Sequence, residues 1–98
     1  MAEEPAPRWT FLTNHAHVLV CIARDPDTRL RDIARDVGIT ERAAQGILGD
    51  LVDAGYVERT RVGRRNTYTV NRGASLRHEL ERGHSVGDLL GAVDAAPE

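Results

Sequence analysis

Arginine side chains, which pair readily with phosphates and with guanine edges, gather in one short stretch of this sequence. The stretch VERTRVGRRNTYTV, residues 57–70, carries four arginines around a Gly-Arg-Arg-Asn centre. With Arg72 included, residues 57–72 hold five arginines against one glutamate, a local charge of +4 in a 98-residue chain of formal net charge −2. Because the positive charge is confined to one place, the sequence predicts a localised nucleic-acid contact.

Other residue types that could do chemistry form no catalytic or metal-binding pattern. Ser75 and Ser85 lack a Gly-x-Ser-x-Gly context, and Cys21 lies in an apolar run typical of a core residue. The four histidines have no recognisable spacing of metal ligands (His15, His17, His78 and His84). The Gly-Arg-Arg-Asn centre lacks the spacing of a phosphate-binding loop. We therefore expect no enzyme activity, no cofactor and no metal site.

The length and composition predict one small globular domain with a single core. Hydrophobic residues make up 41% and charged residues 29% of the chain, values typical of a soluble protein. The longest apolar run, residues 18–23, is far shorter than the roughly 20 residues that span a bilayer. The start, MAEEPAPRW, lacks the basic and apolar segments of a signal peptide. We expect a cytoplasmic protein without membrane contact, with residues 1–8 as a flexible leader.

Helical periodicity predicts two helices in the first part of the chain. Thr13 is placed to cap a helix over residues 14–24, which the Asp-Pro-Asp run ends. Thr28 is placed to cap a second helix over residues 29–37, and Gly38 follows where a left-handed C-terminal residue is favoured.

A third helix is predicted to begin at its cap Thr40 and to end at Gly55. Its apolar residues form one stripe (Ala44, Ile47, Leu48, Leu51 and Val52). The opposite face carries polar or small residues (Arg42, Gly46, Gly49 and Asp53). Only Gly38 and Ile39 separate the second and third helices. Such a tight connection predicts a helix-turn-helix unit, whose second helix is placed to enter a DNA major groove.

The arginine-rich stretch is predicted to be a β-hairpin, with strands up to Val62 and from Thr67 to Val70. The expected turn is Gly63, Arg64, Arg65 and Asn66. Alternation places Thr60 and Val62 inward with Tyr68 and Val70, and Arg59 and Arg61 outward. Val57 shares the parity of the arginines, so it is expected in the helix–strand connection or before a bulge. The predicted fold is α+β and mostly helical: a winged helix-turn-helix with three core helices and a hairpin wing.

The sequence resembles the winged helix-turn-helix transcriptional regulators of the MarR and ArsR type, particularly small bacterial single-domain members. The resemblance covers residues 9–72 and is carried by the run DLVDAGYV and by the wing GRRNTY. It implies that the third helix reads a major groove and that the wing touches the adjacent minor groove or backbone. Position 46 departs from the pattern, because similar proteins often have an arginine where this chain has Gly46.

The resemblance and the charge pattern together define the expected DNA-binding residues. Arg42 can pair with guanine and Gln45 with adenine. The complete expected set spans the start of the third helix and the hairpin (Thr40, Glu41, Arg42, Gln45, Gly46, Arg59, Arg61, Arg64, Arg65 and Asn66). The expected partner is double-stranded DNA. The alternative is a protein-interaction module, since Gly46 and Gly49 on the exposed face would also suit a partner helix.

Residues 73–98 are expected to form a C-terminal extension with one short helix. Ser85 and Asp88 resemble a capping box, and the apolar spacing predicts a helix over residues 86–94. Its stripe either closes the domain's own core or packs against the first helix of a second subunit (Val86, Leu89, Leu90 and Val93). The second alternative predicts a homodimer, the assembly that the resemblance implies. The sequence assigns no small-molecule effector.

Overall fold

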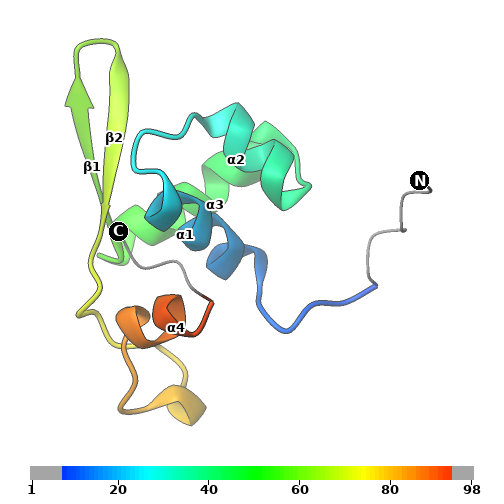
Figure 1. Ribbon diagram of the computed structural model, residues 1–98, viewed down its shortest axis with the longest axis vertical. Coiled ribbons are helices and arrows are strands. Elements are labelled where there is room, and N and C mark those ends of the chain that lie inside the picture. The colour runs from blue at the N-terminus through cyan, green and yellow to red at the C-terminus, as the bar shows by residue number, and fades with distance from the viewer. Residues whose placement is uncertain (1–7, 94–98) are drawn as a thin grey trace.

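The computed structural model describes residues 8–93 (Figure 1). The elements follow in the order α1 (Asn14–Arg24), α2 (Leu30–Val37), α3 (Glu41–Asp53), β1 (Val57–Val62), β2 (Arg65–Val70), the 3-10 helix η1 (Glu79–Glu81) and α4 (Val86–Ala92). Three helices followed by an antiparallel hairpin make a winged helix-turn-helix, so the predicted fold is confirmed. Residues 1–7 of the expected leader and residue 94 of the expected last helix lie outside the described residues.

Two of the three helix caps predicted at threonine residues are present. The Oγ1 atoms of Thr13 and Thr40 accept hydrogen bonds from the backbone N–H groups of Ala16 (3.3 Å) and Ala43 (3.0 Å). These bonds satisfy N–H groups that have no partner within the helix. Each threonine therefore sets the first residue of its helix.

The prediction that Thr28 caps the second helix is wrong. Helix α2 begins at Leu30, and its N-cap residue Arg29 makes no side-chain capping bond. The backbone N–H of Thr28 instead donates to the carbonyl of Asp25 at 3.1 Å, which closes a turn over the Asp-Pro-Asp run. Thr28 belongs to this turn, and the helix starts two residues later.

One hydrophobic core joins the helices, the base of the hairpin and α4. Its buried members come from every major element (Val18, Leu19, Ile22, Ala23, Ile33, Ala34, Ala44, Leu48, Leu51, Val57, Tyr68, Val86 and Leu90). Ala44, Leu48 and Leu51 belong to the predicted stripe of α3, whereas Ile47 and Val52 are half-buried at the edge of the core. The burial of one face of α3 leaves its opposite face to solvent.

The hairpin pairs in a register that differs from the prediction. Val57 lies opposite Val70, and Arg59 opposite Tyr68, without a bulge between them. Residues paired across an antiparallel ladder point to the same face. The arginines of β1 therefore share a face with the buried Val57 and Tyr68, and the predicted inward orientation of Thr60 and Val62 is wrong because both are exposed.

The physical reason is that only the base of the hairpin reaches the core. Val57 and Tyr68 are buried there, while the outer residues of both strands are exposed on either face, apart from the half-buried Thr67. Along the outer part, the alternation of residue types therefore does not indicate which side chains face the core. The hairpin stands away from the helices as a thin projection (Figure 1).

The turn of the hairpin is also shorter than predicted. Val62 pairs with Arg65, so the loop consists of Gly63 and Arg64 alone, and Arg65 and Asn66 belong to β2. Gly63 has a φ of 63°, which a two-residue hairpin loop commonly requires and glycine adopts without strain. Arg64 consequently occupies the tip of the wing.

Helix α4 closes the domain's own core. Ser85 and Asp88 form the predicted capping box, but the helix ends at Ala92, with Val93 as its C-cap. Val86 and Leu90 are fully buried, so neither presents a surface to another subunit; Leu89 and Val93 are half-buried. Backbone bonds from Val86 to Ala74 (2.9 Å) and from Gly87 to Arg72 (2.8 Å) hold the start of α4 against the chain that follows β2.

No helix within residues 8–93 is long and apolar enough to cross a membrane.

Leu90→Ala should lower the free energy of unfolding by about 2–5 kcal/mol, because it removes a fully buried side chain and leaves a cavity. Urea unfolding followed by circular dichroism measures the change. Leu89→Ala, which removes the same atoms from a half-buried position, is the control and should cost less. A Leu90→Ala protein as stable as the original would mean that α4 is not part of the core.

Candidate nucleic-acid interface

The start of α3 presents the predicted major-groove residues to solvent. Thr40, Glu41, Arg42, Gln45 and Gly46 are all exposed. Helix α2 supports this arrangement, because the tight turn between the helices is closed by bonds from Gly38 (2.8 Å) and Ile39 (2.9 Å) to the carbonyl of Ala34. The five predicted residues therefore lie on one helix turn and its continuation, free of the core.

The wing divides its predicted residues between two faces. Arg59, Arg61 and Asn66 lie on the face of Val57 and Tyr68, whereas Arg65 lies on the other face, beside Val62. All of them, and Arg64 at the tip, are exposed. The Nε of Arg61 donates to the carbonyl of Gly63 at 3.2 Å, so this side chain runs along the strand toward the tip. The hairpin thus carries positive charge on both faces and at its end.

Arg65 has an additional contact that links the wing to the helices. Its Nη2 donates to the backbone carbonyl of Asp27 at 2.9 Å. The neighbouring carbonyl of Pro26 accepts the backbone N–H of Tyr68 (2.9 Å) and the Oγ1 of Thr67 (3.3 Å). The α1–α2 loop is therefore bonded along β2, and Arg65 helps to hold the wing in place.

Sequence reasoning did not find this contact between the loop and the wing. From the sequence, the Asp-Pro-Asp run indicates only the end of the first helix. Proline suits such a position, since it has no N–H to leave unpaired while its carbonyl still accepts hydrogen bonds. No local periodicity marks a bond between residues about 40 positions apart.

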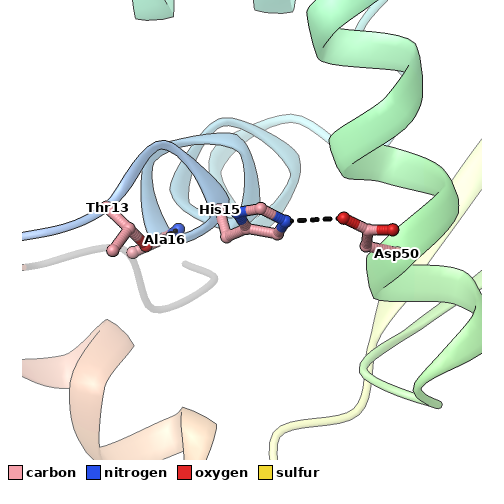
Figure 2. A network of polar contacts seen from close by, with 4 residues as sticks. All are labelled: Thr13, His15, Ala16 and Asp50. Atoms are coloured by element: carbon pink, nitrogen blue, oxygen red, sulfur yellow. Dashed lines mark hydrogen bonds and ion pairs between the residues drawn. The ribbon is translucent and has the colours of Figure 1, made fainter.

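Two acidic side chains of α3 lie apart from its N-terminal turn. Asp50 contacts His15 of α1, with 2.8 Å between Oδ2 and Nε2 (Figure 2). Both side chains are largely exposed, so the pair contributes at most about 1 kcal/mol to stability. The contact directs Asp50 toward α1. Asp53 is exposed at the end of the helix, which leaves Glu41 as the acid beside the predicted groove-reading residues.

Gly46 and Gly49 have no structural role that the fold explains. A Cβ atom built on either residue would meet no atom within 4 Å apart from its chain neighbours and the backbone of α3 itself. Glycine in a helix interior costs about 0.8–1 kcal/mol relative to alanine. Gly46 is exposed and Gly49 half-buried, and no contact of an added Cβ explains why either position of α3 is a glycine.

Cys21 of α1 is half-buried at the edge of the core, so it is less buried than the core residue that its apolar surroundings predict. Burial raises the pKa of its thiol, and the nearby carboxylate of Asp36 acts in the same direction. A thiolate is therefore disfavoured at neutral pH. Among residues 8–93, no three histidine, cysteine or acidic side chains gather as metal ligands would.

The fold and its exposed basic wing define a winged helix-turn-helix domain of the DNA-binding class. Comparison with protein families assigns it more closely, because residues 12–61 match the IclR helix-turn-helix domain. The chain belongs to this family, and its domain is that of a DNA-binding transcription regulator. A comparison with curated protein sequences gives no significant match.

The resemblance to the MarR and ArsR type is corrected by this match, since IclR is a different family of winged helix-turn-helix proteins. The motifs that carried the resemblance were the end of α3 and the wing. Both positions follow from the architecture: the end of α3 enters the core, and a wing needs a tight turn. Such features identify the winged helix-turn-helix fold, but they do not distinguish the families that share it.

Gly46→Ala should raise the free energy of unfolding by about 0.8–1 kcal/mol, because alanine favours the helix and its Cβ enters open space. Chemical denaturation of the two proteins measures this difference. Gly49→Ala is a second test of the same argument and should act in the same direction. If either substitution destabilised the protein, the solvent side of α3 would be more crowded than the structure indicates.

Proposed function

We propose that this regulator binds double-stranded DNA sequence-specifically as a homodimer, with the start of α3 in the major groove and the wing on the adjacent minor groove or backbone. The observation that supports this best is the exposure of all ten predicted contact residues. They cover the N-terminal turns of α3 and the outer part of the hairpin (Thr40, Glu41, Arg42, Gln45, Gly46, Arg59, Arg61, Arg64, Arg65 and Asn66).

Base recognition is assigned to Arg42 and Gln45. Arg42 is proposed to donate two hydrogen bonds to guanine O6 and N7, and Gln45 to pair with adenine N6 and N7. Gly46, which has no side chain, lies between these two residues and the centre of the helix. This permits a close approach of the α3 backbone to the DNA. A favourable local charge comes from the helix N-terminus, whose partial positive charge attracts phosphate.

The arginines of the wing are proposed to have two roles, contact with DNA and orientation of the wing. Arg64 at the tip, with Arg59 and Arg61 on one face, contacts phosphates or a narrow minor groove, where the negative potential is greatest. Arg65 already donates to the carbonyl of Asp27. Its main contribution is to orient the wing, with its remaining N–H groups available for a phosphate.

A two-fold dimer would place two recognition helices about 34 Å apart, one turn of DNA, and so predicts a pseudo-palindromic site. Because Val86 and Leu90 are used in the domain's own core, Leu89 of α4 and its C-cap Val93 are the residues of the predicted stripe left for a contact between subunits.

Selection of bound sequences from a random duplex pool tests the proposal. Enrichment of a two-fold-related motif, with an affinity that falls steeply as salt rises, is the expected result. A pool without enrichment would contradict sequence-specific binding. A protein complex that survives high salt would instead favour the interaction module, to which the open face at Gly46 and Gly49 would be suited.

Arg64→Ala should weaken binding to all sequences about equally and reduce the slope of log K against log salt by about 0.9, the value for one phosphate contact. Gln45→Ala should chiefly relax base preference, at about 1–3 kcal/mol for the contacted position. Arg65→Ala should weaken binding with a smaller change in slope than Arg64→Ala, since one of its donors is used within the chain. Fluorescence anisotropy across a salt series measures all three.

Arg82→Ala is the matched control for the two arginine variants. It removes the same charge, but from the end of η1, where Arg82 pairs with Glu79 of the same segment. Its binding and salt slope should equal those of the original protein. Equal losses from the Arg64 and Arg82 variants would show that only net charge matters and would contradict the proposed docking.

The stabilised Gly46→Ala protein gives an independent check. If the α3 backbone approaches DNA closely at residue 46, the added methyl group should weaken binding even though the protein is more stable. An unchanged affinity would place the groove contact nearer to Arg42.

A further inference from the structure

Two aromatic side chains stand in solvent just before α1. Trp9 is 69% and Phe11 93% exposed, and their rings meet edge to face with centroids 5.1 Å apart. We call residues 9–12 the aromatic arm. Mutual contact holds the two rings as one unit, but neither is covered by the domain. Exposed aromatic residues that cluster in this way usually mark an interaction surface.

An open groove of about 650 Å³ begins beside this arm. Its walls come from the start of α1, the end of α3 and the segment from residue 76 to α4. The apolar part of the lining includes side chains from all three regions (Ala16, Leu19, Leu51, Tyr56, Leu76 and Leu89). We call it the arm groove. Phe11 lies at its edge, yet its exposure shows that it does not fill the groove of its own chain.

One wall of the arm groove is held by a specific contact. The hydroxyl of Tyr56 donates to the carbonyl of Ser75 at 2.7 Å. This bond ties the chain after β2 to the end of α3. The rim is polar and includes the His15–Asp50 pair (Figure 2). An apolar floor with a polar rim is the usual anatomy of a protein interface.

We propose that two copies of this chain exchange their aromatic arms, so that Trp9 and Phe11 of each copy occupy the arm groove of the other. The chain supplies both halves of the contact, an uncovered apolar group and an unfilled apolar groove beside it. A two-fold axis then forms both contacts at once, as an isologous dimer requires. This inference deepens the homodimer of the proposed function, and it rests on that proposal for its role in DNA binding.

The area of such an exchange fits a dimer. A buried tryptophan or phenylalanine covers about 150–250 Å², so the exposed parts of the two rings offer roughly 300 Å² per arm. With an equal area of groove wall, and with both arms counted, the exchange buries roughly 1,200 Å², the lower end of the range for specific interfaces. We therefore expect an association that depends on concentration within an accessible range.

The position of the groove leaves the DNA-binding elements free. The groove is built around α4 and the start of α1, while the wing projects from the opposite end of the molecule (Figure 1). Leu89, one of the α4 residues predicted to contact a second subunit, lines the groove. The exchange therefore engages the terminal segments and keeps the start of α3 and the hairpin tip uncovered.

Sedimentation equilibrium without DNA, from about micromolar to several hundred micromolar protein, tests the exchange directly. The original protein should form dimers, and Phe11→Ala and Trp9→Ala should each weaken dimerisation about tenfold or more. Val62→Ala is the matched control, because Val62 is a comparably exposed apolar residue on the wing. It should leave dimerisation unchanged. An original protein that stays monomeric throughout, or a Phe11→Ala protein that dimerises normally, overturns the proposal.

Complementation separates an arm exchange from any other loss of association. Ala54→Arg places a long charged side chain in the arm groove at the exposed C-cap of α3, where a cation is compatible with the helix dipole. Phe11→Ala and Ala54→Arg should each dimerise more weakly than the original protein. Their mixture should associate more strongly than either variant alone, because the intact arm of one enters the intact groove of the other and one of the two contacts is restored. A mixture that associates no more strongly than the separate variants overturns the exchange.

Failure of this inference differs from failure of the proposed function. Phe11→Ala should retain the original thermal stability, since its side chain is uncovered, and should still bind a half-site while losing the gain from a two-fold site. A protein that exchanges arms but selects no DNA sequence would keep the dimer and contradict sequence-specific binding. A protein that selects a single half-site as a monomer would support sequence-specific binding and contradict the arm exchange.

Discussion

The structure depends on the burial of Val57 and Tyr68 at the base of the hairpin. These two side chains are the point where the wing enters the core shared by the helices, and the carbonyl of Pro26 bonds to the backbone of Tyr68 beside them. Beyond that point the strand residues are exposed, apart from the half-buried Thr67. The core positions the wing at its base, the α1–α2 loop adds bonds along β2, and the arginines stay exposed because the core ends before it reaches them.

Local chemistry explains which parts of the fold could be predicted from the sequence. The caps Thr13 and Thr40, the stripe of α3 and the capping box at Ser85 each depend on residues within one or two helical turns. The hairpin orientation could not be obtained in this way, because alternation assigns an inward face only where a strand is half-buried along its length. Of the expected binding residues, Arg65 has a contact with Asp27 that only the folded chain brings together.

Membership of the IclR helix-turn-helix family and the local positive charge bear on different questions. The family match extends from residue 12 to residue 61, so it includes the start of α3 but ends before the tip of the wing. The arginines at 64 and 65 thus lie outside the matched segment. Their role rests on their own chemistry and position. The match also leaves out the segment after the wing, which includes α4 and one wall of the arm groove.

The two-stranded sheet also has an exposed side that must be protected. Pro26 occupies part of the outer edge of β2, whereas within the described residues no strand pairs with the outer edge of β1. An open edge is a template for unwanted strand pairing between molecules, and charged side chains discourage it. Glu58, Arg59 and Arg61 all lie on β1. The same charges that suit the wing to a polyanion therefore protect the free protein against edge-to-edge aggregation.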